Sequence, residues 1–105
     1  MAVLLLPMIT WAQTTTVPTR NVPITLVVQP GKPDVVLVGT LNAPDPENIF
    51  RTSDGAVAWQ SAVDGTEPNI SVAGLAFNQR NANMVFAGDG GFGYLYRSED
   101  GGVTW

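Results

Sequence analysis

From residue 23 onward, short apolar segments alternate with polar turns. Residues 24–28 read I-T-L-V-V and residues 35–38 read V-V-L-V, and the segment between them carries two prolines and a glycine. Apolar runs of this length, bounded by proline and glycine, are typical of β-strands. Because these two runs are almost continuously apolar, they predict inner strands that are buried on both faces.

The same succession returns 49 residues later without a gap. Residues 72–88 repeat residues 23–39 as apolar strand, polar turn, apolar strand and terminal glycine. Such a period indicates a repeat protein. A β-sandwich would also have short strands but would not explain this register. The density of glycine and proline and the lack of a 3.6-residue period exclude a helical repeat.

A short motif follows in each repeat. Residues 98–105 read S-E-D-G-G-V-T-W, and residues 52–59 read T-S-D-G-A-V-A-W, 46 positions earlier. The first unit therefore has three extra residues between Gly39 and Thr52, where we expect a loop. Aspartate and glycine are turn residues, and aromatic strand residues flank them. The motif predicts a hairpin turn in which Asp100 accepts backbone hydrogen bonds and Trp105 packs beneath.

Each unit therefore predicts four strands. They lie at about residues 24–29, 35–39, 49–53 and 57–61 in the first unit, and 72–77, 84–88, 94–98 and 103–105 in the second. Four antiparallel strands in a unit of this length are a β-propeller blade. We predict an all-β fold with two blades of an incomplete propeller, 23–61 and 62–105, the second truncated at its last strand, after a linker over 13–22.

A propeller closes with about four to eight blades. Two open blades expose strand edges and apolar flanks, which favours pairing with other chains. The expected partners are therefore the remaining blades, supplied by further sequence of a longer protein. The alternative is a small two-sheet protein that oligomerises to close the ring.

The motif resembles the Asp-box, or BNR repeat, of sialidases, sortilin-type receptors, xyloglucan-degrading glycoside hydrolases and photosystem II assembly factors. The resemblance covers residues 23–105 and implies that the motif lies between the third and fourth strands of a blade, away from the ligand site. The copy at 52–59 departs from it at Ala56 and Ala58. The residues to which it assigns a structural role are Ser98, Asp100, Gly102, Thr104 and Trp105, with Thr52, Asp54 and Trp59.

The amino-acid composition limits the classes of protein and of chemical site that the chain can form. Hydrophobic residues make up 45% of the chain and charged residues 13%, a balance typical of a folded, turn-rich β protein. The net charge of −4 argues against a nucleic-acid binder. The chain contains no cysteine and no histidine. This excludes disulfides, zinc-finger-type sites and Ser-His-Asp or Cys-His nucleophiles within the chain, and we predict no metal and no cofactor.

The first residues, M-A-V-L-L-L-P-M-I-T-W-A, form an apolar run that is too short to span a membrane. They are similar to the apolar region of a secretory signal, with small residues placed for cleavage before Gln13. We expect residues 1–12 to be a truncated signal peptide and the protein to be secreted or periplasmic. The alternative is an N-terminal strand.

In a propeller, the links between second and third strands and between blades share one face, which usually meets the ligand. Here these links are residues 40–48, 62–71 and 89–93, and they contain no lysine or arginine. An acidic face suits a cation, a basic partner or acid–base work on a sugar, although solvated loops are often polar. The candidates on this face are Asp45, Glu47, Asp64, Glu67, Asp89 and Phe92.

Asp89 is the one candidate for catalysis. It ends a strand and precedes G-G-F-G, whose glycines let a ligand approach, and Phe92 can stack on a sugar ring. Xyloglucan-degrading propellers place a catalytic aspartate in a comparable loop, but the threonine of their segment is missing here. A glycosidase needs two carboxylates, and no partner for Asp89 can be named. The other interpretation is an Asp-Gly turn.

Two functions remain open. The first is an extracytoplasmic binding or assembly module that docks a protein or polysaccharide on its loop face, and the second is a glycoside hydrolase. A sialidase would require an F-R-I-P segment and an arginine triad, which the chain lacks. Arg51 and Arg97 occupy equivalent repeat positions, where we expect them to pair with the turn aspartates. The binding module is favoured because no complete catalytic set is visible.

Overall fold

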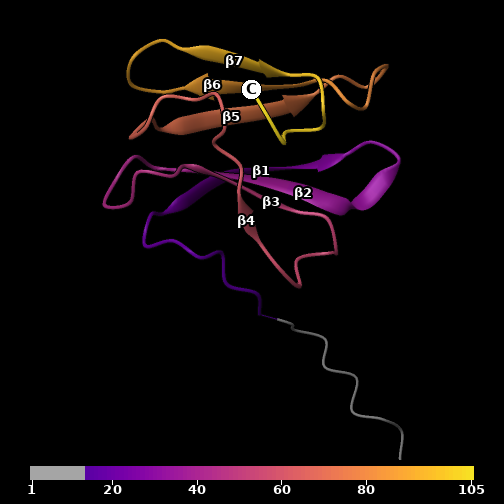
Figure 1. Cartoon of the computed structure of the whole chain (residues 1–105), viewed down its shortest axis with the longest axis horizontal. Coiled ribbons are helices and arrows are strands. Elements are labelled where there is room, and N and C mark those ends of the chain that lie inside the picture. The colour runs from indigo at the N-terminus through magenta and orange to yellow at the C-terminus, as the bar shows by residue number, and fades with distance from the viewer. Residues whose placement is uncertain (1–13) are drawn as a thin grey trace, which may run out of the picture.

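The computed structural model describes residues 14–105, so the predicted signal segment lies outside the described residues. The described part is all-β, without an α-helix, and forms two antiparallel sheets (Figure 1). No helix in this part is long and apolar enough to cross a membrane. The strands are β1 (Pro23–Gln29), β2 (Lys32–Thr40), β3 (Ile49–Thr52), β4 (Gln60–Ser61), β5 (Val72–Phe77), β6 (Val85–Asp89) and β7 (Leu95–Ser98).

The first sheet has the strand order β1-β2-β3-β4, and every neighbouring pair is antiparallel. The turn between β1 and β2 contains only Pro30 and Gly31, and Gly31 has a φ of 74°. Proline fixes its own φ, and glycine takes the left-handed conformation without a steric cost, so this sequence closes a tight hairpin. This sheet has the four antiparallel strands that are expected of a propeller blade.

The second sheet has the order β5-β6-β7 and repeats the first one in detail. Its register shift between Val72 and Gly74 lies 49 residues after the shift between Pro23 and Thr25 in the first sheet. The sequence repeat is therefore a repeat of backbone geometry, including the irregularity near the start of the first strand.

The two sheets lie face to face as two layers, with β5 over β1 and β2 (Figure 1). Leu37 and Ile49 of the first sheet are fully buried in the same cluster as Val72 and Val85 of the second. Ala62 and Ile70 of the connecting segment join this cluster. The core is thus the interface between blades.

Burial of the two inner strands differs from the prediction. In β2 both faces are buried, whereas in β1 the side chains of Ile24, Leu26 and Val28 are exposed, Leu26 by 65%. The prediction that β1 is buried on both faces is therefore wrong for these residues. The reason is that the second sheet covers only one face of the first and that β1, unlike β2, is an edge strand of its sheet.

The predicted fourth strands are also too long. β4 contains only Gln60 and Ser61, and residues 103–105 form no strand. After each turn, two backbone N–H groups donate to the turn aspartate, as Val57 and Ala58 do to Asp54, and so they are not available to a neighbouring strand.

Candidate functional site

The three predicted loops meet at one end of the molecule. The N–H of Asn69 donates to the carbonyl of Pro46 at 3.1 Å, and the N–H of Gly90 donates to that of Ser71 at 2.7 Å. The backbone N–H of Ser71 also donates to Asp89 Oδ1 at 3.1 Å. Residues 40–48, 62–71 and 89–93 therefore form one continuous surface, which we call the loop face.

Asp89 holds its own loop together. Its Oδ1 accepts the N–H of Gly91 at 3.0 Å, and its Oδ2 accepts the N–H of Phe92 at 2.6 Å. Burial by itself raises the pKa of Asp89, but the hydrogen bonds from Gly91, Phe92, Ser71 and Tyr94 together bring this pKa below its ordinary value. A general acid needs a raised pKa, so this environment does not suit Asp89 to that role and fits a carboxylate that organises its own loop.

Asp45 is neutralised by a residue outside the loops. Arg20 donates from Nη2 at 2.5 Å and from Nε at 3.0 Å to Asp45 Oδ1, and its backbone N–H donates to Oδ2. The side-chain hydrogen bond of Arg20 is the main reason that the pKa of Asp45 is lowered. The count of charges by loop overlooked Arg20, because it lies in the segment that the sequence predicts to be a linker.

That segment is fixed by Asn21, which sequence reasoning also missed. Asn21 is only 3% exposed, and its side chain donates to the carbonyls of Asp45 and Glu47 and accepts the N–H of Asp45. Its repeat equivalent, 49 residues later, is the buried Ile70. That equivalence was the available signal that residue 21 belongs to the first unit.

The other predicted acids do not gather around Asp89. The carbonyl of Asp64 accepts the N–H of Trp105 at 2.9 Å, so Asp64 lies near the second motif. Glu47 and Glu67 line separate hollows on either side of Pro68. Among the described residues, no three acids, cysteines or histidines are close enough to hold a metal ion.

An aromatic row crosses the loop face next to Glu67. The rings of Phe92 and Tyr94 have centroids 6.3 Å apart, and those of Tyr94 and Tyr96 are 5.9 Å apart. Phe92 and Tyr94 line a hollow of about 210 Å³ together with Glu67, and Phe92 is 69% exposed. The backbone N–H of Glu67 donates to the hydroxyl of Tyr96. Exposed rings beside an acidic hydrogen-bond acceptor can stack on a sugar and hold its hydroxyl groups.

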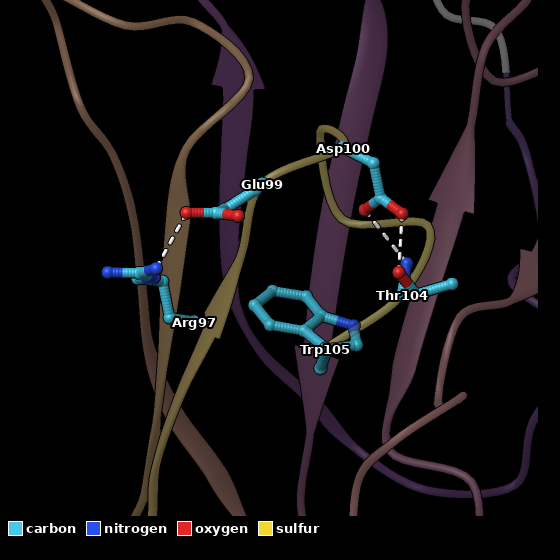
Figure 2. Close-up of a pocket in the computed structure, with 5 residues that line it drawn as sticks. All are labelled: Arg97, Glu99, Asp100, Thr104 and Trp105. Atoms are coloured by element: carbon cyan, nitrogen blue, oxygen red, sulfur yellow. Dashed lines mark hydrogen bonds and ion pairs between the residues drawn. The ribbon is translucent and has the colours of Figure 1, made fainter.

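The motif at 98–105 forms a closed hydrogen-bonded turn. Asp100 Oδ1 accepts the hydroxyl of Ser98 at 2.7 Å and the N–H groups of Val103 and Thr104 at 3.1 and 2.9 Å. The Thr104 hydroxyl donates to Asp100 Oδ2 (Figure 2). This side-chain bond is the largest of the causes that lower the pKa of Asp100 to about 2. The indole N–H of Trp105 donates to the carbonyl of Ala62.

The motif at 52–59 repeats this geometry with one bond fewer. Asp54 Oδ1 accepts the hydroxyl of Thr52 and the N–H groups of Val57 and Ala58. Ala58 stands where Thr104 supplies a hydroxyl, so Oδ2 of Asp54 has no equivalent of that bond. The indole N–H of Trp59 donates to the Thr15 hydroxyl at 3.0 Å.

A hollow of about 290 Å³ lies beside the second turn, lined by Arg97, Glu99, Asp100, Thr104 and Trp105 (Figure 2). Arg97 pairs with Glu99 at 2.6 Å, whereas Arg51 donates to the carbonyl of Gly101. Neither arginine pairs with its turn aspartate, which corrects that expectation. In the first sheet β4 pairs with β3 at the equivalent place, so this hollow is an open strand edge.

The turn aspartates predict that the chain loses stability in acid. Because the pKa of folded Asp100 is about 2, below its usual value of 3.8, its stabilisation is complete above about pH 4 and is lost as pH falls toward 2. Lowered pKa values of Asp54 and Asp89 act in the same direction. We expect the Tm to fall between pH 5 and pH 2 and to fall less in Asp100→Asn. Equal pH dependence in both proteins, measured by circular dichroism, would contradict this role of Asp100.

No family model matches the chain, and no curated protein matches it. Among solved structures, the chain is similar to an ancestral GH74 enzyme, a glycoside hydrolase with a β-propeller fold, with 24% sequence identity and a TM-score of 0.62. The match covers 79% of this chain but only 12% of that enzyme. At this identity the likeness supports the propeller fold and leaves the activity open.

Proposed function

We propose that the chain supplies two blades of an extracytoplasmic Asp-box β-propeller that binds a polysaccharide on its loop face. The observation that carries this proposal is the exposed pair of rings, Phe92 and Tyr94, beside Glu67. The two rings are tilted by 43° to one another, so each can stack on the face of a separate sugar unit, and the glutamate can accept hydrogen bonds from the sugar hydroxyl groups.

The geometry at Asp89 favours binding over hydrolysis. Both carboxylate oxygens of Asp89 accept backbone N–H groups, and its pKa is lowered. A retaining or an inverting glycosidase needs a second carboxylate facing the first across the substrate. Asp45, the acid of the neighbouring loop, is already paired with Arg20. The alternative is a glycoside hydrolase, since the GH74 enzyme with the similar fold is one, but a shared fold does not carry the activity over.

Removing the aromatic rings tests the binding proposal. We expect Phe92→Ala and Tyr94→Ala each to weaken the binding of xyloglucan oligosaccharides about two- to tenfold, since a ring contact is worth about 0.5–1.5 kcal/mol. Isothermal titration calorimetry measures the change. Val57→Ala is the matched control, because Val57 is 84% exposed but lies on an Asp-box turn. Unchanged affinity in both ring variants contradicts the proposal.

The same oligosaccharides decide between the two functions. A binding module leaves them intact, whereas a hydrolase releases new reducing ends. Turnover that is lost in Asp89→Asn but kept in Phe92→Ala would favour the hydrolase.

Export of the protein is tested separately. We expect the chain with its own N-terminus to be cleaved before Gln13 on secretion from a bacterial host, and mass spectrometry of the secreted protein identifies the cleavage site.

A further inference from the structure

The exposed face of the first sheet repeats a face that is buried in the second sheet. Leu75 and Phe77 of β5 are each 8% exposed and pack toward the first sheet. Their equivalents 49 residues earlier, Leu26 and Val28, are 65% and 47% exposed. Val85 and Ala87 likewise correspond to Val36 and Val38. We call the outer side of the first sheet the leading face; there Ile24, Leu26 and Val28 of β1 are exposed, whereas Val36 of β2 is half-buried and Val38 is only 6% exposed.

The exposed face of the second sheet repeats the face of the first sheet that is covered. In the intact chain, Val27, Leu37 and Gly39 lie under the second sheet. Their equivalents, Ala76, Phe86 and Gly88, line the opposite side of β5 and β6 from the core. We call this outer side, formed by Gly74, Ala76, Phe86, Gly88 and Arg97, the trailing face.

Three contacts define how such faces fit within the chain. A Cβ built on Gly39 would lie 2.6 Å from Val72 Cγ1, so glycine is what allows β5 to approach β2. The side chain of Arg51 crosses to the carbonyl of Gly101 at 3.1 Å. The backbone of Gly102 packs directly on Leu37.

The exposed faces hold the equivalents of these same residues. Gly88 corresponds to Gly39, and a Cβ built there meets nothing within 4 Å. Arg97 corresponds to Arg51, and Phe86 to Leu37. On the leading side, Pro23 corresponds to Val72, and the turn containing Ala56 corresponds to the turn containing Gly102. The leading face therefore repeats the surface that the second sheet contributes to the internal interface, and the trailing face repeats the surface that the first sheet contributes.

We infer that a second copy of this chain packs its trailing face on the leading face, head to tail, in the arrangement that the two sheets have within one chain. The leading face is hollowed into a groove of about 530 Å³ whose lining contains no charged side chain, including Ile24, Leu26, Val36 and Val38. An apolar surface of this kind is covered by another apolar surface. The trailing face supplies Ala76, Phe86 and two glycines.

The N-terminal segment forms part of the wall of this groove. Thr15 and Val17 line it together with the strand residues, and the Thr15 hydroxyl accepts the indole N–H of Trp59. Within the chain, Ala62 accepts the indole N–H of Trp105 at the margin of the internal interface. The N-terminal segment thus has the same position relative to the leading face that residues 62–71 have relative to the core between the sheets. A head-to-tail contact continues from copy to copy until a ring closes.

Two substitutions, one on each face, test the inference. We expect the 105-residue chain to form dimers or larger assemblies that dissociate on dilution, measured by sedimentation velocity. Leu26→Glu places a charge in the groove. Gly88→Val adds a side chain to the trailing face at a position where a Cβ meets nothing within 4 Å. Each variant is expected to be monomeric. A mixture of the two forms a one-to-one heterodimer, because each retains the face that the other has lost.

Other outcomes overturn the inference. A monomeric wild-type chain at high micromolar concentration would do so. Assembly that is lost in Leu26→Glu but kept in Gly88→Val would indicate symmetric pairing of leading faces, and assembly that survives both substitutions would indicate non-specific aggregation. Val57→Glu, which adds a charge to a valine that is 84% exposed and does not line the groove, is the control and is expected to assemble normally. Should Leu26→Glu fail to fold, Gly88→Val and the milder Leu26→Gln keep the mixing experiment available.

Discussion

Replacing Gly39 with valine is expected to unfold the chain or to separate its two sheets. A Cβ at this position lies 2.6 Å from Val72 Cγ1 and 2.8 Å from Val72 Cβ, distances at which something must move. Val72 is fully buried and belongs to β5, so it cannot turn away without lifting β5 from the core. Overpacking in a core costs about 1–3 kcal/mol and sometimes more. Because Thr25 Cγ2 also lies only 2.7 Å from this Cβ, we expect a loss at the upper end of that range, about 3 kcal/mol. A chain of this size has only about 5–15 kcal/mol of stability in total.

Gly88→Val is the matched control for this prediction. It makes the same chemical change at the equivalent position of the repeat, where a Cβ meets nothing within 4 Å. Urea unfolding followed by tryptophan fluorescence measures both variants, and the Leu26→Glu background keeps self-association out of the comparison. If the two valines lower the unfolding midpoint equally, the core does not lie between the sheets as described.

Much of the fold follows from local pattern. The position and order of the first three strands in each unit agree with the prediction to within a few residues, because short apolar runs between turn residues have few other structures open to them. The repeat also predicts that the two units have the same order of strands and turns. The sequence alone could not show which faces are covered: Leu26 and Val28 are apolar like their buried equivalents Leu75 and Phe77, and their exposure depends on which part of the molecule lies beside them.

The site shows the same limit. The turn at Asp100 was predicted from its own eight residues, since its hydrogen bonds are all local. The neutralisation of Asp45 was missed, since Arg20 reaches it from 25 positions away along the chain. The structural likeness supports the propeller fold, but neither it nor the loop pattern decides between binding and catalysis. That choice depends on whether a second carboxylate faces the substrate.

An alanine at position 102 is expected to be severely destabilising, and a glycine at position 56 stabilising. Gly102 has a φ of 89°, and a Cβ there would lie 2.7 Å from Cδ1 of the fully buried Leu37. The left-handed conformation costs a residue with a side chain about 1–2 kcal/mol, and the clash adds roughly as much again. We therefore expect Gly102→Ala to lower the free energy of unfolding by about 3 kcal/mol.

The cost of the left-handed backbone conformation is already present at Ala56. This residue is the equivalent of Gly102, and its φ is 74°. The second cost is absent, because its position faces the groove of the leading face and not a core side chain. Glycine removes the backbone strain but is more flexible in the unfolded chain, so Ala56→Gly is expected to raise stability by up to about 1 kcal/mol.

Urea unfolding of both variants and of the double variant measures these effects. Since the two turns belong to different blades and no hydrogen bond of the described residues joins 52–59 to 98–105, their free-energy changes are expected to add. Both variants exchange glycine and alanine at a positive φ, so both change the cost of the backbone conformation. The amount by which Gly102→Ala destabilises the chain more than Ala56→Gly stabilises it then measures the cost of crowding Leu37. A Gly102→Ala chain as stable as the wild type would mean that the second turn does not rest on the first sheet, and the interface from which the leading and trailing faces are inferred would lose its support.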